Sequence, residues 1–344
     1  MRRSVLALAL VLAALTGGAV DARPDTPGPG VAIFYYTWYG TPALDGAWQH
    51  WGQGGATPPS RVASSYYPTR GAYSSSDAAV TRAHMREIVA AGVDTVVVSW
   101  WGPGSTEARR FADVARAARQ SGLAVAAHLE PWTGRTPETT VEAIRGLARQ
   151  GVSDFYVYDS TLDADERWAA ALAPLEGVRV LANTWLPGRA ARGGFDGLYS
   201  YDVLVHDGRS FRRVCSAARR LGLICAPSVG PGFDARPATA ITAVASRRDG
   251  RRYDAMWRAA IDARPDLITV TSYNEWHEGT QIEPARAGVA GCRSYERAYG
   301  LTGKAAETAY LTRTAYWAAR SRSAEASRVR PTSTGPKRAG AGTR

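Results

Sequence analysis

Short runs of apolar and β-branched residues recur along the 344-residue chain, separated by stretches with a helical spacing of apolar positions. Most runs lack a polar face, which is typical of parallel strands that helices cover on both sides. The runs predict eight strands, at residues 31–37, 94–100, 123–129, 153–158, 178–183, 195–200, 223–228 and 266–272.

Helices are predicted between these strands. Apolar residues in 252–264 fall at i, i+3, i+4, i+7 and i+8, and Pro265 follows them. Thr136 and Pro137 have the residue types of a helix N-cap and first position. Another helix is expected from Ser76-Asp77 to near Gly92, whereas 187–194 is too short for a full helix. Eight strands alternating with helices predict an α/β fold, a single (β/α)8 TIM barrel.

The two ends of the chain differ from the body. Residues 1–22 resemble a signal peptide, with Arg2 and Arg3 before an apolar run and small residues after it. An uncleaved membrane anchor is the alternative, although the run is short for a bilayer span. Residues 320–344 are poor in apolar residues and are predicted to form a disordered basic tail. The barrel domain is therefore expected over 23–319, in an exported protein that is not inserted stably in a membrane.

Charge and cysteine content argue against several classes of protein. The formal net charge is +11, but seven positive side chains and one glutamate lie in 320–344, so nucleic-acid binding is not indicated. Three cysteines without metal-ligand spacing allow at most one disulfide and predict no metal site. No glycine-rich nucleotide motif follows the first strand. We expect a monomer without a cofactor.

Aromatic, carboxylate and amide side chains gather where the predicted strands end. In a parallel barrel these carboxyl ends form the face that carries the active site. Aromatic rings can stack on sugar rings, and amides and carboxylates bind hydroxyl groups, so the pattern indicates a carbohydrate site. The residues are Tyr36, Trp38, Tyr39, Trp100, Trp101, His128, Glu130, Trp132, Tyr158, Asp159, Asn183, Trp185, Tyr199, Tyr201, Ser228, Asn274, Glu275 and Glu278.

Glu275 and Glu278 are the candidate catalytic pair, within TSYNEWHEGTQIEPA. If the chain turns at Trp276, as Gly279 permits, residues three apart come within about 5–6 Å. Retaining glycosidases hold two carboxyls about 5–5.5 Å apart, and such closeness separates their pKa values into an acid and a base. Two solvated loop acids or helix caps are the alternative.

Several other residues have structural interpretations. His277 next to Glu278 lacks the second histidine of a zinc helix and is expected to be a hydrogen-bonded structural residue. His84 and Glu87 are expected on a solvated helix face. Trp168, Trp257 and Trp317 are expected in the core. His128 and Glu130 share one strand face, where Glu130 is either a ligand contact or part of a structural ion pair.

Eight motifs, in order over roughly 31–320, resemble glycoside hydrolase family 99, the endo-acting α-mannosidases and α-mannanases. They are FYYTWYG with the His50-Trp51 pair, SSYYPTRGAYSSSD, VSWWGPG, HLEPWTGR, FYVYDS, GFDGLYSY, PSVGPGF and NEWHEGTQIEPA. The family's usual P-W-Y-G is Thr37-Trp38-Tyr39-Gly40 in this chain.

The resemblance implies a retaining (β/α)8 enzyme that cuts internal α-1,2-mannosidic bonds in α-mannan or mannose-rich glycans. It assigns Glu275 as the base that deprotonates the substrate's 2-hydroxyl, forming a 1,2-anhydro sugar, and Glu278 as the acid. Trp101 matches a position that is tyrosine in the animal Golgi enzymes. The substrate contacts that the motifs and strand ends imply are Tyr36, Tyr39, His50, Trp101, His128, Glu130, Tyr158, Tyr199 and Asn274.

Two other functions remain open at this point. The same barrel could be a catalytically silent carbohydrate-binding protein, although binding alone requires no paired acid and base. It could also be a glycosidase with another α-specificity. Both alternatives predict a different outcome from incubation with α-mannan.

Overall fold

A computed structural model describes residues 29–329, in which strands and helices alternate. The strands are β1 (Gly30–Tyr35), β2 (Thr95–Trp100), β3 (Ala124–Leu129), β4 (Asp154–Val157), β5 (Arg179–Asn183), β6 (Gly197–Tyr199), β7 (Ile224–Ala226), β8 (Ser228–Val229), β9 (Phe233–Asp234), β10 (Val244–Ala245) and β11 (Leu267–Val270). The helices are α1 (Pro42–Asp45), α2 (Ala78–Ala90), α3 (Thr106–Gln120), α4 (Pro137–Ala148), α5 (Asp165–Leu172), α6 (Pro187–Arg192), α7 (Phe211–Arg220), α8 (Arg251–Ala263), α9 (Gly303–Glu307) and α10 (Ala309–Val329).

The main sheet is parallel and closes on itself. Its order is β7-β6-β5-β4-β3-β2-β1-β11-β8, and only Pro227 separates β7 from β8 in the chain. One extended segment, 224–229, therefore pairs with β6 through its first half and with β11 through its second half. The eight predicted strands all form, and the prediction of a (β/α)8 barrel is confirmed.

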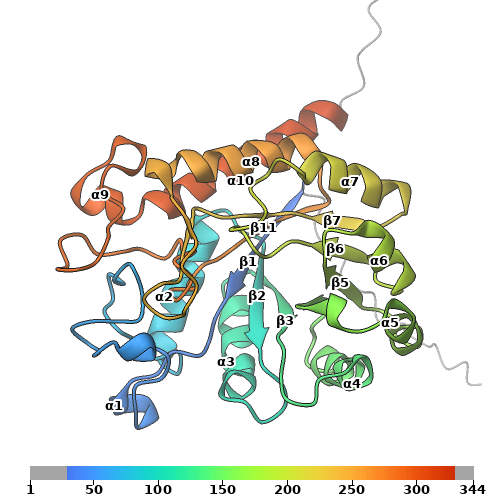
Figure 1. The fold of residues 1–344 in the computed structure, drawn as a ribbon, viewed down its shortest axis with the longest axis horizontal. Coiled ribbons are helices and arrows are strands. Elements are labelled where there is room, and N and C mark those ends of the chain that lie inside the picture. The colour runs from blue at the N-terminus through green and yellow to red at the C-terminus, as the bar shows by residue number, and fades with distance from the viewer. Residues whose placement is uncertain (1–28, 330–344) are drawn as a thin grey trace, which may run out of the picture.

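Helices surround this sheet (Figure 1). The C-terminal helix α10 contacts both α8 and α2, so it completes the outer layer between the last and the first of the long helices. The predicted caps are confirmed, because Thr136 accepts a hydrogen bond from Thr139 N–H at the start of α4, and Asp77 accepts from Ala79 N–H at the start of α2. The segment expected to be too short for a full helix is the six-residue α6.

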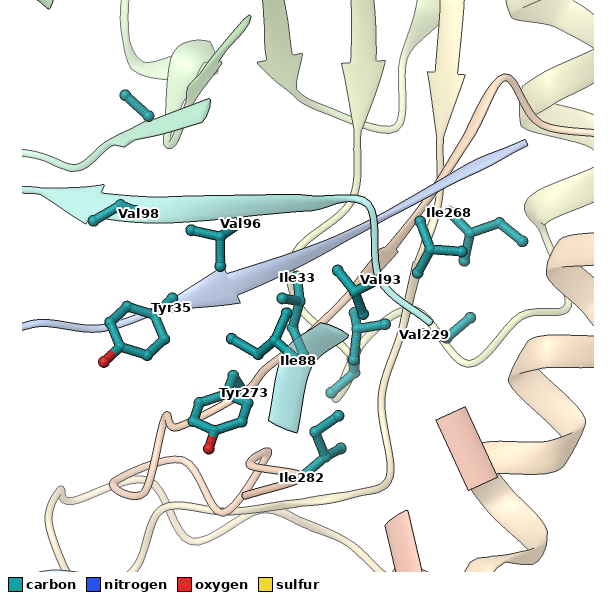
Figure 2. Close-up of a cluster of buried hydrophobic side chains, with 14 of the residues drawn as sticks. Ile33, Tyr35, Ile88, Val93, Val96, Val98, Val229, Ile268, Tyr273 and Ile282 are labelled. Atoms are coloured by element: carbon teal, nitrogen blue, oxygen red, sulfur yellow. The ribbon is translucent and has the colours of Figure 1, made fainter. Parts of the chain in front are cut away.

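Side chains alternate between two cores along β1. Ala32, Phe34 and Tyr36 point into the barrel, in a cluster with residues of other strands such as Tyr156 and Tyr199. The intervening side chains point outward to the helices. Figure 2 shows part of this outer core, in which Ile33 and Tyr35 of β1 gather with Ile88 of α2 and with Val96, Val98, Tyr273 and Ile282. The period of two is the physical reason for both clusters.

One predicted surface position is wrong. His84 on α2 is fully buried, with Nδ1 3.0 Å from the Tyr35 hydroxyl and Nε2 3.1 Å from Glu283 Oε1. Glu87 is partly exposed and accepts a hydrogen bond from the Tyr273 hydroxyl. This face of α2 packs on the strands, and the buried polar partners come from distant parts of the chain. The core positions of Trp168, Trp257 and Trp317 are confirmed.

The helix α10 continues to Val329, so the first part of the expected disordered tail, residues 320–329, is helical. Arg322 fixes this turn by donating hydrogen bonds to Gly92 O and Asp94 Oδ1, and Ser321 is buried. Local composition did not indicate these distant partners. Residues 1–28, which include the predicted signal peptide, and residues 330–344 lie outside the described chain.

The predicted limit of one disulfide agrees with the structure. Cys215 on α7 is bonded to Cys225 on β7, and the thiol of Cys292 is free. The bridge ties a helix to the barrel segment that closes the sheet. No helix within residues 29–329 has the length and apolar character to cross a bilayer.

Candidate active site

The two candidate glutamates lie on one turn that directly follows β11. Residues 276–279 form the turn, with Gly279 N–H donating to Trp276 O and Thr280 N–H donating to Glu275 O. Gly279 has φ of 63°, a left-handed conformation that glycine adopts without strain. The prediction that the chain turns after Glu275 is therefore confirmed.

Glu275 is held as a hydrogen-bond acceptor. Its Oε1 receives the backbone N–H of His277 at 3.0 Å and that of Glu278 at 3.4 Å, and its own N–H donates to Ser272 Oγ. The side chain is only 2% exposed. Backbone donors favour the charged form of a carboxyl, so this environment suits a base better than an acid.

Burial nevertheless dominates the ionisation of both carboxyls. Burial, and next the charge of Glu278, hold the pKa of Glu275 well above its usual range. Burial, followed by the charges of Asp202 and Glu130, raises the pKa of Glu278 to about 8. Within residues 29–329, the donor to the Glu278 carboxyl is the Tyr201 hydroxyl, at 3.5 Å, and no backbone N–H donates to this carboxyl as two do to Glu275. The difference in donors therefore favours Glu278 as the proton donor and Glu275 as the base.

The raised pKa of Glu278 makes stability depend on pH. An unfolded glutamate titrates near pH 4.3, so between about pH 4.3 and about pH 8 the folded protein binds more protons than the unfolded chain. The free energy of unfolding should fall as pH rises through this window. We expect Glu278→Gln, which cannot ionise, to have a higher Tm than the wild type near pH 8 and the same Tm near pH 4. Equal Tm values at both pH values, measured by calorimetry, would contradict this.

A chain of hydroxyl groups leads from the barrel interior to Glu278. The Tyr36 hydroxyl donates to the Tyr201 hydroxyl at 2.6 Å, and Tyr201 in turn donates to Glu278 Oε2. Burial, and next the charge of Glu278, raise the pKa of Tyr201 well above its usual range. Burial, and next the charge of Glu130, likewise raise the pKa of Tyr36, so both tyrosines stay protonated and able to donate near neutral pH.

Aromatic rings stack in one group beside the turn. Trp38 lies parallel to the ring of His50, with centroids 4.8 Å apart, and its ring also contacts Trp101 and His277. Trp101 is half-buried and donates its indole N–H to Ser99 Oγ at 2.8 Å. His277 Nε2 lies 3.0 Å from His50 O, and burial lowers the pKa of His277 to about 4, so this histidine is neutral. The expected structural role of His277 agrees with these contacts.

A second polar group lies at the ends of the middle strands. His128 Nδ1 is 2.8 Å from Glu130 Oε1, and its Nε2 is 2.8 Å from the Tyr199 hydroxyl. Glu130 also accepts a hydrogen bond from Ser99 Oγ, and the Tyr158 ring contacts His128 edge-on. All three of His128, Glu130 and Tyr199 are buried, while Tyr158 is half-buried. Glu130 thus has partners within the protein, His128 and Ser99, as expected for the structural role that the sequence left as an alternative to ligand contact.

Two of the predicted contacts lie behind the turn and support it. Tyr39 is fully buried, and its hydroxyl donates to Asn274 O and accepts from Trp276 N–H. Asn274 is also fully buried, and its amide bonds both the N–H and the C=O of Tyr36. These residues join the end of β1 to the catalytic turn. Direct sugar contact by them, as by the other predicted positions, stays a prediction.

Tyr201 was missing from the residues predicted as substrate contacts, although it is among the strand-end residues. Tyr201 comes two residues after Tyr199, and both rings lie in the barrel-interior cluster. Because side chains two apart on an extended segment face the same way, this spacing could have predicted the position of Tyr201. Arg247 and Glu283 also contact the segment around the catalytic turn, but the sequence could not predict this, because both residues lie outside the strand ends. Glu283 is buried and accepts the indole N–H of Trp276 and the hydroxyl of Tyr73.

No group of three or more potential metal-ligating side chains lies together between residues 29 and 329. The polar side chains at the barrel mouth form two hydrogen-bonded groups, one around Glu275 and Glu278 and one around His128 and Glu130. Glu275, which is buried, and Glu278, which is half-buried, lie on one turn and differ in their hydrogen-bond donors, and acid–base cleavage of a glycosidic bond requires such an unequal pair of carboxyls.

The fold and the site together define a glycoside hydrolase built on a (β/α)8 barrel. Residues 29–323 match the model of glycosyl hydrolase family 99, and the chain belongs to that family.

Known proteins of this kind are similar along most of the chain. The chain is 34% identical to a glycoprotein endo-alpha-1,2-mannosidase-like protein of Danio rerio, over 74% of this chain and 71% of the relative. It is 29% identical to the glycoprotein endo-alpha-1,2-mannosidase of Rattus norvegicus, over 74% and 68% of the two chains. The solved structure of the GH99 endo-alpha-mannosidase from Bacteroides thetaiotaomicron, in complex with BIS-TRIS-propane, superimposes with a TM-score of 0.77 at 29% identity, covering 87% and 98%.

Proposed function

We propose that the protein is a retaining, endo-acting α-mannosidase that cuts internal α-1,2-mannosidic bonds in α-mannan or mannose-rich glycans. The observation that carries the proposal is the placement of Glu275, which is buried, and Glu278, which is half-buried, on a single turn beside stacked aromatic rings. The endo-alpha-mannosidase relatives described above support the same substrate class. An exported, monomeric protein is consistent with this role.

The proposed mechanism uses the substrate's own 2-hydroxyl as the nucleophile. Glu275 takes the proton of the 2-hydroxyl, whose oxygen attacks the anomeric carbon while the glycosidic bond breaks and Glu278 protonates the leaving oxygen. Glu278, now a carboxylate, then takes a proton from the water that opens the 1,2-anhydro sugar, and Glu275 returns its proton to O2. The backbone donors on Glu275 and the high pKa of Glu278 support this division of roles.

The direct test is incubation of the purified protein with yeast α-mannan at about pH 6, followed by product analysis. Released oligosaccharides rather than single mannose units, with retained anomeric configuration, are expected. Binding without any cleavage would favour a silent carbohydrate-binding protein. Cleavage of a non-mannose polymer alone would instead favour another α-specificity.

Trp101 is proposed to select the sugar on the non-reducing side of the cleaved bond. Its indole N–H is bound to Ser99, which fixes the ring and leaves it no free polar group. A tyrosine could bind the equatorial 2-hydroxyl of glucose, whereas an indole face favours mannose, whose axial 2-hydroxyl leaves that face less crowded.

We therefore expect kcat/KM for mannosyl-capped α-1,2-mannosides to exceed that for glucosyl-capped ones, by about 1–3 kcal/mol in transition-state binding. Trp101→Tyr should shrink or reverse this preference. The measurement is kcat/KM on the two matched substrates with both proteins. An unchanged ratio would make Trp101 a wall residue without a role in specificity.

A further inference from the structure

Arg247 is a buried cation with an unusual set of contacts. Its side chain is among the buried residues, 8% exposed, and it follows β10 on the β9–β10 hairpin. Within the described chain it forms no ion pair with a carboxylate, and the central carbon of its guanidinium lies 4.6, 4.7 and 4.5 Å from the ring centroids of Tyr66, Tyr295 and Tyr310. Burying a charge without an ionic partner is costly, so the position requires an explanation.

The guanidinium binds the segment that carries the catalytic pair. Its Nη2 donates to Gly279 O at 2.9 Å and to Gln281 O at 2.7 Å. These carbonyls come one and three residues after Glu278. Hydrogen bonds from a charged donor are about twice as strong as neutral ones.

Strand β9 of the β9–β10 hairpin also binds the catalytic turn. Asp234 N–H, on β9, donates to the backbone oxygen of Glu278 at 2.7 Å. A Cβ at Gly279 would come within 3.2 Å of the Asp234 backbone, so the turn and the hairpin are in close contact. Three backbone carbonyls, at positions 278, 279 and 281, are thus bound by β9 and by Arg247, which lies just after β10, and Arg247 donates to two of the three.

We propose that Arg247 is a positioning residue that fixes the catalytic turn and thereby the Glu278 carboxyl. The inference rests on the proposed function of Glu278 as the proton donor. Arg247 touches the carbonyls of the turn and acts through them on the carboxyl. The three tyrosine rings lie around the guanidinium and offset part of its loss of hydration through cation–π attraction.

The test compares Arg247→Met with Arg248→Met. Arg248 is the next residue, is exposed, and loses the same charge on substitution, so it is a matched control. We expect Arg247→Met to lower kcat about 100-fold, the loss that a misplacement of about 1 Å can cause, with KM changed by less than about threefold. Arg248→Met should keep wild-type kcat. Equal kcat in all three proteins overturns the proposal.

A double-mutant cycle separates positioning from general loss of structure. If Arg247 acts through Glu278, adding Arg247→Met to Glu278→Gln should cost little further activity, because the group being positioned is already inactive. An unreduced loss of about 100-fold in that background would indicate a purely structural role and overturn the inference. If Arg247→Met does not fold, Arg247→Lys, which keeps the charge and can reach one carbonyl, takes its place in the cycle.

Hydrogen exchange provides a readout that does not depend on activity. Backbone amides of residues 275–281 should exchange faster in Arg247→Met, and at the wild-type rate in Arg248→Met. If these amides exchange at the wild-type rate in Arg247→Met, the anchoring role is contradicted, whatever the kcat of the variant. Failure of the wild type to cut any α-mannoside, with faster exchange in Arg247→Met, would refute the proposed function while leaving the anchor supported.

Discussion

Glu278→Gln is expected to lower kcat on α-1,2-linked mannan by about 10²–10⁴-fold, the usual contribution of general acid–base catalysis. The amide has the shape of the protonated carboxyl but cannot transfer a proton. Tyr201 still meets a hydrogen-bond acceptor at this position, so the network of the turn should be retained. Steady-state kinetics on defined manno-oligosaccharides, together with a folding check by circular dichroism, would measure the effect.

Substrates with different leaving groups test the role of Glu278 as the proton donor more specifically. An aryl α-mannoside whose phenol leaves without protonation does not require the acid in the first step, so Glu278→Gln should affect bond cleavage in it far less. The wild type should also lose activity on oligosaccharides as pH rises through about 8, where Glu278 ionises. A loss that is equal for both leaving groups would assign the proton donor to another residue.

Glu275→Gln is expected to cause a loss of similar size that does not depend on the leaving group. Its proposed task is to take the proton of the 2-hydroxyl, which every substrate requires. The substitution also places an amide against the backbone donors of His277 and Glu278, which both contact the same oxygen, Oε1. The oxygen of the amide can keep both contacts, and the fold should be retained.

The same variant should bind substrate without turning it over. Calorimetric titration with an α-1,2-linked manno-oligosaccharide would therefore show an affinity near the KM-derived value of the wild type, and a substrate lacking the 2-hydroxyl should be resistant even to the wild type. Near-normal turnover by Glu275→Gln, with a comparable pH profile, would remove Glu275 from the mechanism.

The sequence by itself determined the barrel and the location of its chemistry. Apolar runs at regular intervals, caps such as Thr136 and Asp77, and the spacing in 252–264 are local signals, and each corresponds to an element of the structure. The carboxyl ends of parallel strands necessarily meet on one face, so the polar residues that follow the runs could be assigned to one site. The spacing of Glu275 and Glu278 and the nearby glycine were sufficient to predict their shared turn.

Only the tertiary structure decided which of these side chains lie at the surface of the site and which lie behind it. Tyr39 and Asn274 are predicted contacts that prove to be fully buried and to support the turn, and their direct contact with a sugar stays a prediction. His84, on a helix with no local sign of burial, has partners at Tyr35 and Glu283. The helical residues 320–329 depend in the same way on Gly92 and Asp94.

The physical reason is that burial and hydrogen bonding join residues that are far apart in sequence. Desolvation and the charges of Asp202 and Glu130 raise the pKa of Glu278. The hydrogen bonds from Arg247 to the turn join residues more than thirty positions apart in the sequence. Periodicity specifies which face of an element is apolar, because that depends on neighbours along the chain. The partner that meets each polar group is specified only when the barrel closes and brings those positions together.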